Sequence, residues 1–272
     1  MSWVGVGGVR LYYERRGDGP SVLFISGASG DAGHWTGVAD VLATQYTVVT
    51  YDRRGNSRSP RPADWTATTI QEQADDAAGL LEALDLAPAI VFGTSAAAGI
   101  LAGVSLRHPE VVRGAIFHEP VFPSGFPNMD AVRAVRAARR ARLEEGMARG
   151  GPRLAMELLL RDVADDQVYE SLDPQLRERL LDNGSVLFEI APFAAYEPSP
   201  EELTAFGVPC FVTAGAANRD PSARGHWRFE VARWLANHLG TTVVELPGGH
   251  MAYLGEPEGF AEALRPLLHQ LT

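Results

Sequence analysis

The sequence predicts an α/β protein in which a mostly parallel sheet is covered by helices on both faces. Short apolar segments rich in β-branched and aromatic residues alternate with segments of helical periodicity, which is typical of such sheets. The alternation stops after residue 120 and resumes near residue 200, and the stretch between them has helical spacing without a convincing strand. We therefore assign residues 1–120 and 200–272 to an α/β core and residues 121–199 to a helical cap inserted after the sixth strand.

The N-terminal third supplies strands and turns. Residues 9–17 alternate between apolar and polar, residues 21–26 form a short buried run, and residues 46–52 are β-branched and aromatic. A helix follows over residues 68–86, because its apolar residues recur at helical spacing on one side: Ile70, Ala74, Ala77, Leu80, Leu81 and Leu84.

The remaining core elements follow the same alternation. Residues 89–93 predict a strand, residues 96–106 a helix and residues 112–119 a further strand. Beyond the cap, the same reasoning gives two more strands, at residues 208–215 and 241–247. It also gives two more helices, one at about residues 222–239 and one that ends near residue 268.

Composition excludes several classes of protein. The chain has 272 residues, of which 46% are hydrophobic and 21% charged, as expected for a globular protein with a substantial core. Its formal net charge of -10 argues against nucleic acid as a partner. The single cysteine, Cys210, cannot form an internal disulfide and is interpreted as a buried strand residue.

The N-terminus lacks the features of a signal peptide, and the charge-free stretch 86–106 is better explained by a strand, a turn and a helix than by a membrane span. We expect a soluble cytoplasmic protein that binds neither membranes nor nucleic acids. The sequence does not determine the oligomeric state, and a homodimer is compatible with it.

The stretch "VFGTSAAAGI" places Ser95 between a buried strand and a helix. On such a sharp turn a serine is exposed, and small residues are needed two positions before and after it, where Gly93 and Ala97 stand. A serine hydroxyl becomes nucleophilic when a base takes its proton and N–H donors stabilise the oxyanion. We expect the backbone N–H of Ala96 to be one donor, and that of Gly27 or Ala28, in the glycine-rich loop after an earlier strand, to be the second.

The base should be a histidine on a loop after the last strand. His250 fits this place, because it follows a strand and a Pro-Gly-Gly turn and precedes the terminal helix. The other histidines considered fit this place less well: His108 begins a turn after a helix, His238 and His269 lie in or near helices, and His34 and His226 lack a strand-end setting.

Three segments together resemble the α/β-hydrolase superfamily: the turn around Ser95, "YDRRGNSRSP" at 51–60 and "LPGGHMAYLGEPEGFAEAL" at 246–264. They are spread over nearly the whole chain. The resemblance implies an α/β-hydrolase fold, with an eight-stranded, mostly parallel sheet and a helical cap.

The acid of the expected triad is less obvious. Most members of that superfamily have an aspartate after the seventh strand, where this chain has Asn218, which could orient an imidazole but could not offset its charge. Two carboxylates remain as candidates. Glu119 ends the sixth strand at the same sheet edge as Ser95, and Asp220 lies two residues beyond Asn218. We prefer Glu119, with Asp220 second and neither residue as the third option.

A narrower resemblance supports Glu119. The segments "FHEP" at 117–120 and "TAGAANRD" at 213–220 are similar to those of fungal zearalenone lactone hydrolases, which have a glutamate after the sixth strand as the triad acid. That family differs in having a Ser-Ser-Gly turn where this chain has Thr-Ser-Ala. It also has a cap tryptophan at the place that Tyr169 matches best.

These observations favour a serine hydrolase that cleaves a carboxylic ester through an acyl-enzyme, with a lactone preferred and a resorcylic macrolactone such as zearalenone included. No metal or organic cofactor is required. We expect a small apolar ester or lactone to bind between core and cap, against Trp35, Phe122, Met129, Tyr169, Phe188, Phe193, Tyr196 and Met251. Two alternatives stay open: hydrolysis of a carbon–carbon bond beside a carbonyl, and ligand binding without catalysis.

One cap segment, "AVRAVRAARRAR" at 131–142, carries five arginines. It is interpreted as a solvated helix face, with an anion-attracting rim as the less favoured alternative.

Overall fold

An eight-stranded sheet forms the centre of the protein. The computed structural model describes residues 2–61, 65–127, 129–164, 166–190 and 198–272. The strand order is β1-β2-β4-β3-β5-β6-β7-β8, in which β1 and β2 run antiparallel to their neighbours and the other strands are parallel. The strands span Ser2–Val6, Val9–Arg16, Ser21–Ile25, Thr47–Tyr51, Ala89–Thr94, Val112–His118, Cys210–Gly215 and Val243–Leu246. The expected strands are therefore confirmed.

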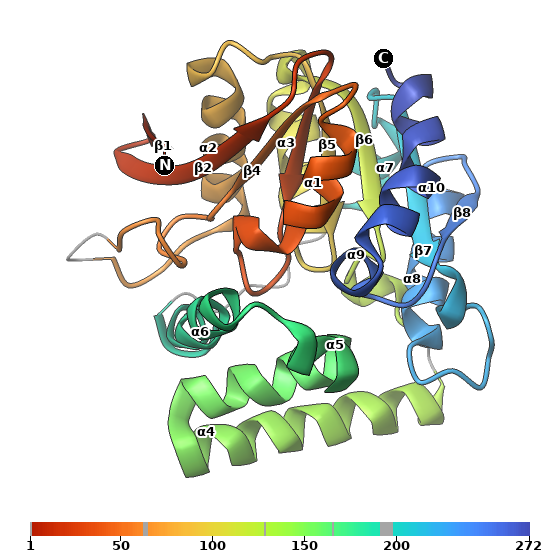
Figure 1. Ribbon diagram of the computed structural model, residues 1–272. Helices are drawn as coiled ribbons and strands as arrows, with labels where there is room; N and C mark the ends of the chain where they lie inside the picture. Colours follow the sequence, from red (N-terminus) through yellow and green to blue (C-terminus); the bar gives the residue numbers. More distant parts are fainter. Residues whose placement is uncertain (1, 62–64, 128, 165, 191–197) are drawn as a thin grey trace.

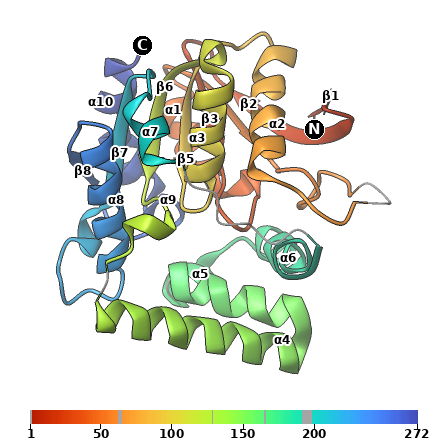
Figure 2. The ribbon, with the colours of Figure 1, turned by 180° about the vertical axis from the view of Figure 1, so that it is seen from behind.

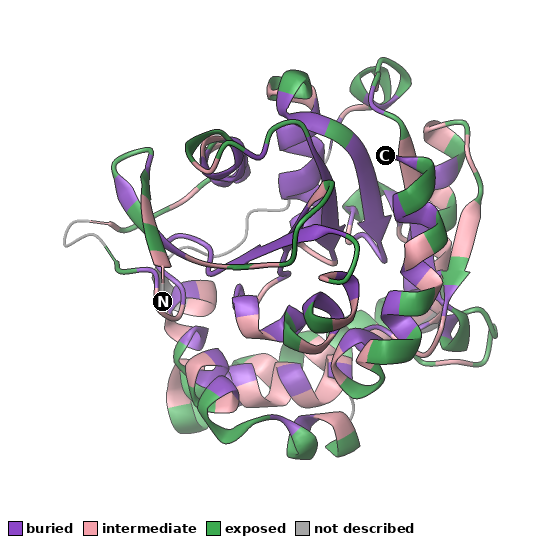
Figure 3. Cartoon of the chain, turned by 45° about the horizontal axis from the view of Figure 1, so that its top comes forward, coloured by how far each residue is buried: buried purple, intermediate pink, exposed green. Residues whose placement is uncertain are grey.

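Helices cover both faces of this sheet (Figures 1 and 2). Helices α2 (Ile70–Ala83), α3 (Ala97–Arg107) and α8 (His226–His238) pack on one face, and α1 (Thr36–Leu42) and α10 (Pro257–Gln270) on the other. Alternate residues of β5 serve the two cores, with Val91 in one and its neighbours Ile90 and Phe92 in the other. Such a strand is apolar throughout because neither side meets water. Figure 3 shows buried residues concentrated on the strands and on the inner sides of the helices.

The helix boundaries lie close to the expected ones, and α2 has a clear start. Thr69 caps it by accepting a hydrogen bond from the backbone N–H of Glu72. Helix α1 was not expected from the sequence, because its seven residues, "TGVADVL", are too few for a reliable period.

Between β6 and β7 lie the helices α4 (Asp130–Ala164), α5 (Asp166–Ser171), α6 (Pro174–Asp182) and α7 (Pro200–Thr204), with a short π-helical segment at Val186–Ile190. Helix α4 folds back on itself at Gly151, whose φ of 69° lies in the left-handed region, and Pro152 follows (Figure 1). The helices α4–α6 lie at one end of the sheet. Their own small core includes Met156, Tyr169 and Leu180. Among the described residues, no helix is both long and apolar enough to cross a membrane.

Candidate active site

Ser95 sits on a sharp turn between β5 and α3. Its φ of 55° is strained for a residue with a side chain, and its backbone N–H donates to the carbonyl oxygen of His118 at 2.9 Å. A Cβ on Gly93 would lie 2.9 Å from both the Ala97 oxygen and the Leu101 Cβ, so a glycine is required there. Ala97 is completely buried, and its methyl group is accommodated.

The loop after β3 lies directly against this serine. A Cβ on Gly27 would be 3.2 Å from the Cβ of Ser95. Arg53 holds the loop from within the core, because its guanidinium donates to the carbonyl oxygens of Ser26, Gly27 and Ala28 at 3.1, 2.8 and 3.1 Å. In a trans peptide the N–H points opposite to the C=O, so the N–H groups of Gly27 and Ala28 both point away from Arg53. Arg53 therefore fixes the orientation of both candidate oxyanion donors.

His250 and Glu119 are in contact. Nδ1 of His250 lies 2.6 Å from Oε2 of Glu119, and both side chains are buried. An ionised carboxylate can only accept, so Nδ1 carries the hydrogen and Nε2 is free to accept a proton. Glu119 has a φ of 44° directly after β6, and this strained backbone turns the carboxylate toward the loop of His250.

The second oxygen of Glu119 is held from β7 and the loop after it. Oε1 accepts hydrogen bonds from the side-chain amide of Asn218 at 2.6 Å and from the backbone N–H of Gly215 at 2.9 Å. The other carboxylate considered, Asp220, is exposed and accepts from the backbone and hydroxyl of Ser222. The geometry thus brings Glu119, and not Asp220, to His250.

Burial and charge set the protonation states of this pair. Burial opposes ionisation of Glu119, but the hydrogen bond and charge interaction with His250 outweigh it and lower the pKa of Glu119 to about 2. Burial and the nearby Arg228 both lower the pKa of His250, while Glu119 opposes this shift. At neutral pH the pair therefore consists of a carboxylate and a neutral imidazole, which can act as a base.

A cavity of about 180 Å³ opens at this point. Its lining includes six residues expected at the site: Gly27, Ala28, Ser95, Ala96, His250 and Met251. The cap contributes an apolar wall made of Met156, Leu159, Leu160 and Val163. Among the described residues, no three His, Cys, Asp or Glu side chains are grouped so that they could hold a metal ion.

Several lining residues were missed from the sequence. His34, Arg139, Trp227, Arg228 and Tyr253 also face the cavity. His34 stands in a short 3-10 helix, and Arg139 and Arg228 lie in long helices, where isolated polar residues are usually at the surface. No local signal in the sequence distinguishes them.

The other expected wall residues lie elsewhere. Trp35 is buried beneath the cavity, where it stacks on Tyr253 at 4.2 Å between ring centroids. Phe122 belongs to the core on the α8 side, Tyr169 to the core of the cap, and Met129 is 58% exposed. Large aromatic side chains gain most by full burial in such cores, which explains their absence from the lining.

Phe188 lines a second cavity, of about 790 Å³, which shares Val121, Arg139 and Trp227 with the first. Phe193 and Tyr196 lie outside the described residues.

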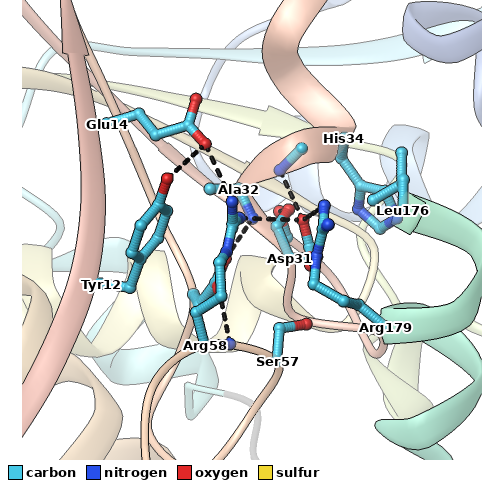
Figure 4. A network of polar contacts seen from close by, with 12 residues as sticks. Tyr12, Glu14, Asp31, Ala32, His34, Ser57, Arg58, Leu176 and Arg179 are labelled. Atoms are coloured by element: carbon cyan, nitrogen blue, oxygen red, sulfur yellow. Dashed lines mark hydrogen bonds and ion pairs between the residues drawn. The ribbon is translucent and has the colours of Figure 1, made fainter. Parts of the chain in front are cut away.

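Polar contacts tie the loop after β3 to helix α6 (Figure 4). Asp31 accepts from Arg179 of α6 at 2.9 Å and from Arg58 at 3.3 Å. Nearby, the side-chain amide of Asn183 donates to the carbonyl oxygen of Ser29. Asp31 is completely buried, and Arg179 lowers its pKa against the opposing effect of burial. The segment that bears Gly27 and Ala28 is thus held by the core and by the cap.

Known proteins resemble this chain over nearly its whole length. The family model described as alpha/beta hydrolase family matches residues 22–263. The uncharacterized hydrolase YraK of Bacillus subtilis is 31% identical over 97% of this chain and 94% of its own length. The zearalenone hydrolase of Bionectria ochroleuca is 28% identical over 94% of this chain and 92% of that protein. The resemblance to zearalenone hydrolases expected from the sequence is therefore confirmed.

Solved structures confirm the fold class. A thermophilic esterase from Thermogutta terrifontis, solved with malate bound, superposes with a TM-score of 0.76 at 21% identity, covering 100% of this chain and 99% of that one. The enol-lactonase from Burkholderia xenovorans LB400 gives a TM-score of 0.71 at 19% identity, covering 98% of this chain and 100% of that one.

Proposed function

Since this chain belongs to the alpha/beta hydrolase family, we propose that it is a serine hydrolase that cleaves carboxylic esters, with a lactone as the favoured substrate. One observation carries the proposal: the buried contact of 2.6 Å between His250 and Glu119, beside the cavity that His250 and Ser95 both line. A neutral imidazole oriented by a carboxylate next to a strained serine is the arrangement that activates a hydroxyl for acyl transfer.

In the proposed reaction, Oγ of Ser95 attacks the carbonyl carbon of the ester, and its proton passes to Nε2 of His250. The carbonyl oxygen becomes an oxyanion, stabilised by the N–H of Ala96 and by that of Gly27 or Ala28. When the C–O bond breaks, the leaving alkoxide takes the proton from His250. Water then attacks the acyl-enzyme, gives a proton to His250, and the free acid leaves as Ser95 is reprotonated. Glu119 holds the imidazole and offsets its charge in both steps.

The preference for a lactone rests on the similarity to zearalenone hydrolases of Bionectria ochroleuca, at 28%, and of Cladophialophora bantiana, at 26% identity. The cavity of about 180 Å³ beside Ser95 shares Val121, Arg139 and Trp227 with the cavity of about 790 Å³, so the proposal includes compact lactones as well as a macrolactone.

The proposal is tested by intact mass spectrometry after treatment with a fluorophosphonate. We expect one adduct on the wild type and none on Ser95→Ala. A screen of small esters, small lactones and zearalenone then defines the substrate, with Ser95→Ala as the blank. Absence of an adduct on a folded wild type would overturn the proposal and favour a ligand-binding role. An adduct without ester or lactone turnover would favour cleavage of a carbon–carbon bond.

A further inference from the structure

Two nitrogens of the buried Arg228 guanidinium, Nε and Nη2, have no hydrogen-bond partner in the part of the chain that the structure describes. Arg228 lies in the first turn of α8, is only 5% exposed and lines the cavity that contains Ser95. A buried charge without hydrogen bonds is costly, and burial lowers the pKa of Arg228 to about 10.

The carboxylates near Arg228 are already engaged. Glu119 is committed to His250, Asn218 and Gly215. Asp162 forms ion pairs with Arg139 and Arg224. Among the described residues, Arg139, Arg224 and Arg228 thus share two carboxylates, Glu119 and Asp162, which leaves one positive charge beside the cavity unbalanced.

Trp227 stabilises the charge of Arg228 only in part. Its ring lies 4.6 Å from the Cζ of Arg228, close enough for a cation–π interaction. The face of a ring attracts the charge but does not accept the directed N–H bonds of a guanidinium. The arrangement therefore lacks an acceptor that bears a negative charge.

A second arginine faces the same cavity from the cap. Arg139 of α4 lines it, and its Nε is also buried without a partner. Of the arginine-rich segment 131–142, Arg139 reaches the cavity, whereas Arg133 and Arg140 pair with exposed carboxylates. The segment therefore has the predicted solvated face, but its Arg139 lines the cavity. Core and cap each contribute a guanidinium with unused N–H groups.

We propose that Arg228, together with Arg139, binds an ionised carboxylate carried by the substrate. This inference rests on the proposed function and narrows its substrate class to hemiesters of dicarboxylic acids and to lactones bearing a carboxylate. A guanidinium matches a carboxylate through two parallel N–H bonds, which a neutral amide cannot reproduce. The carboxylate supplies the missing acceptors and balances the excess positive charge.

The test compares esters that differ only in this group. Monomethyl glutarate is paired with methyl glutaramate, and 5-oxotetrahydrofuran-2-carboxylate with its carboxamide. Succinate and adipate hemiesters locate the best length. We expect wild type to favour the charged member in kcat/KM by at least about 10-fold, since hydrogen bonds to charged groups are worth more than neutral ones. In Arg228→Met, the ratio should fall by about 10- to 100-fold.

Arg224→Met is the matched control. Arg224 also pairs with Asp162 but does not line the cavity of Ser95. This variant should change the ratio by less than about 3-fold, because it removes a nearby charge without removing a cavity contact. If Arg228→Met does not fold, Arg228→Lys keeps the charge and loses the planar fork, and should give an intermediate ratio. A wild-type ratio near one, or one unchanged in the folded Arg228 variants, would overturn the proposal.

A binding measurement separates this proposal from the proposed function. Calorimetric titration of wild type with glutarate should give binding that glutaramide, the neutral diamide, lacks and that Arg228→Met weakens about 10-fold or more. Neutral-ester turnover without glutarate binding would refute the carboxylate site and leave the hydrolase standing. Glutarate binding lost in Arg228→Met, without turnover of any ester, would support the site and refute the hydrolase.

Discussion

The side-chain amide of Asn218 donates a hydrogen bond of 2.6 Å to Oε1 of Glu119. Asn218 occupies the position after β7 where the resemblance to most members of the α/β-hydrolase superfamily predicts an aspartate. Here the amide holds the carboxylate that comes from the neighbouring strand β6. The carboxylate thus follows β6, and the residue after β7 donates a hydrogen bond to it instead of being the acid.

Replacement of Glu119 should abolish most turnover. Glu119→Gln keeps the shape but removes the charge that orients and stabilises His250, so kcat should fall by roughly 10³- to 10⁴-fold. The measurement is steady-state hydrolysis of an ester identified in the screen. Asp220→Asn is the control and should retain activity within about 2-fold, since exposed polar substitutions have small effects. The reverse pattern would move the acid to Asp220.

Loss of the Asn218 amide should weaken catalysis through Glu119. Asn218→Ala removes one N–H donor from a buried carboxylate, and kcat/KM should fall by about 10-fold, as for a hydrogen bond to a charged group. The effect should disappear in the Glu119→Gln background, because a positioning residue acts only through its partner. Asn237→Ala, at an exposed site on α8, should behave like wild type. Equal losses with and without Glu119 would refute this role.

The acid limb of the pH–activity profile should lie at a lower pH than the ordinary pKa of a histidine. Burial and Arg228 lower the pKa of His250, so its neutral, active form persists below about pH 6.5. The charged groups around it are Glu119, Arg139, Arg228 and, on β6, His118. Arg228→Met removes a positive charge and should move the limb of kcat/KM for a neutral ester to higher pH. A limb that stays in place or moves down would contradict this electrostatic effect.

Arg53 should affect the transition state more than substrate binding. Arg53→Met frees three carbonyl groups of the loop that carries Gly27 and Ala28, and kcat should fall by about 10- to 100-fold with KM nearly unchanged. Affinity for an alkyl boronic acid, which mimics the tetrahedral intermediate, should fall in parallel. Arg61→Met, an exposed arginine of the neighbouring loop, serves as the control. A rise in KM with kcat unchanged would contradict a positioning role.

His118 should make stability depend on pH. Burial lowers its pKa to about 4, whereas the unfolded chain binds the proton near pH 6.5. The unfolded state therefore binds more protons between these values, so this contribution is complete above pH 6.5 and is lost as pH falls toward 4. In urea unfolding, His118→Phe should reduce the stability difference between pH 7 and pH 5 by about 2 kcal/mol. His269→Phe, at an exposed site, should keep the wild-type difference.

Sequence patterns predicted the strands other than β1 and the turn at Ser95, and they favoured Glu119 over Asp220 beside His250 with the support of the resemblance to zearalenone lactone hydrolases. These depend on local patterns, because the carboxyl ends of parallel strands meet at one edge of the sheet. The short helix α1 could not be predicted, because seven residues carry too little periodicity.

The cavity walls were predicted less well. Trp35, Phe122 and Tyr169 were expected in the cavity wall, Tyr169 because it matches a cap tryptophan of the zearalenone lactone hydrolases, and each is buried in a core instead. Arg228 was missed because a charged residue in a helix normally faces water. Its surroundings include Glu119, Arg139 and Asp162, which are distant in the sequence, so no local pattern encodes its burial. Arg53 was missed for a similar reason, since its three carbonyl partners come from a distant loop.

The loop after β3 is bonded both to Arg53 of the core and to Arg179 of α6. The position of the cap therefore affects the loop that lies against Ser95. Arg179 of α6 and Asn183, which follows α6 directly, bind Asp31 and Ser29 of this loop, while Arg53 binds its Ser26, Gly27 and Ala28 carbonyl oxygens. A movement of α6 away from the sheet would break these bonds and leave the loop with its contacts to Arg53. If the proposed hydrolase loses these contacts, its loop beside Ser95 has less support and catalysis should slow. Esters small enough to fit between the sheet and α6 would therefore be preferred as substrates.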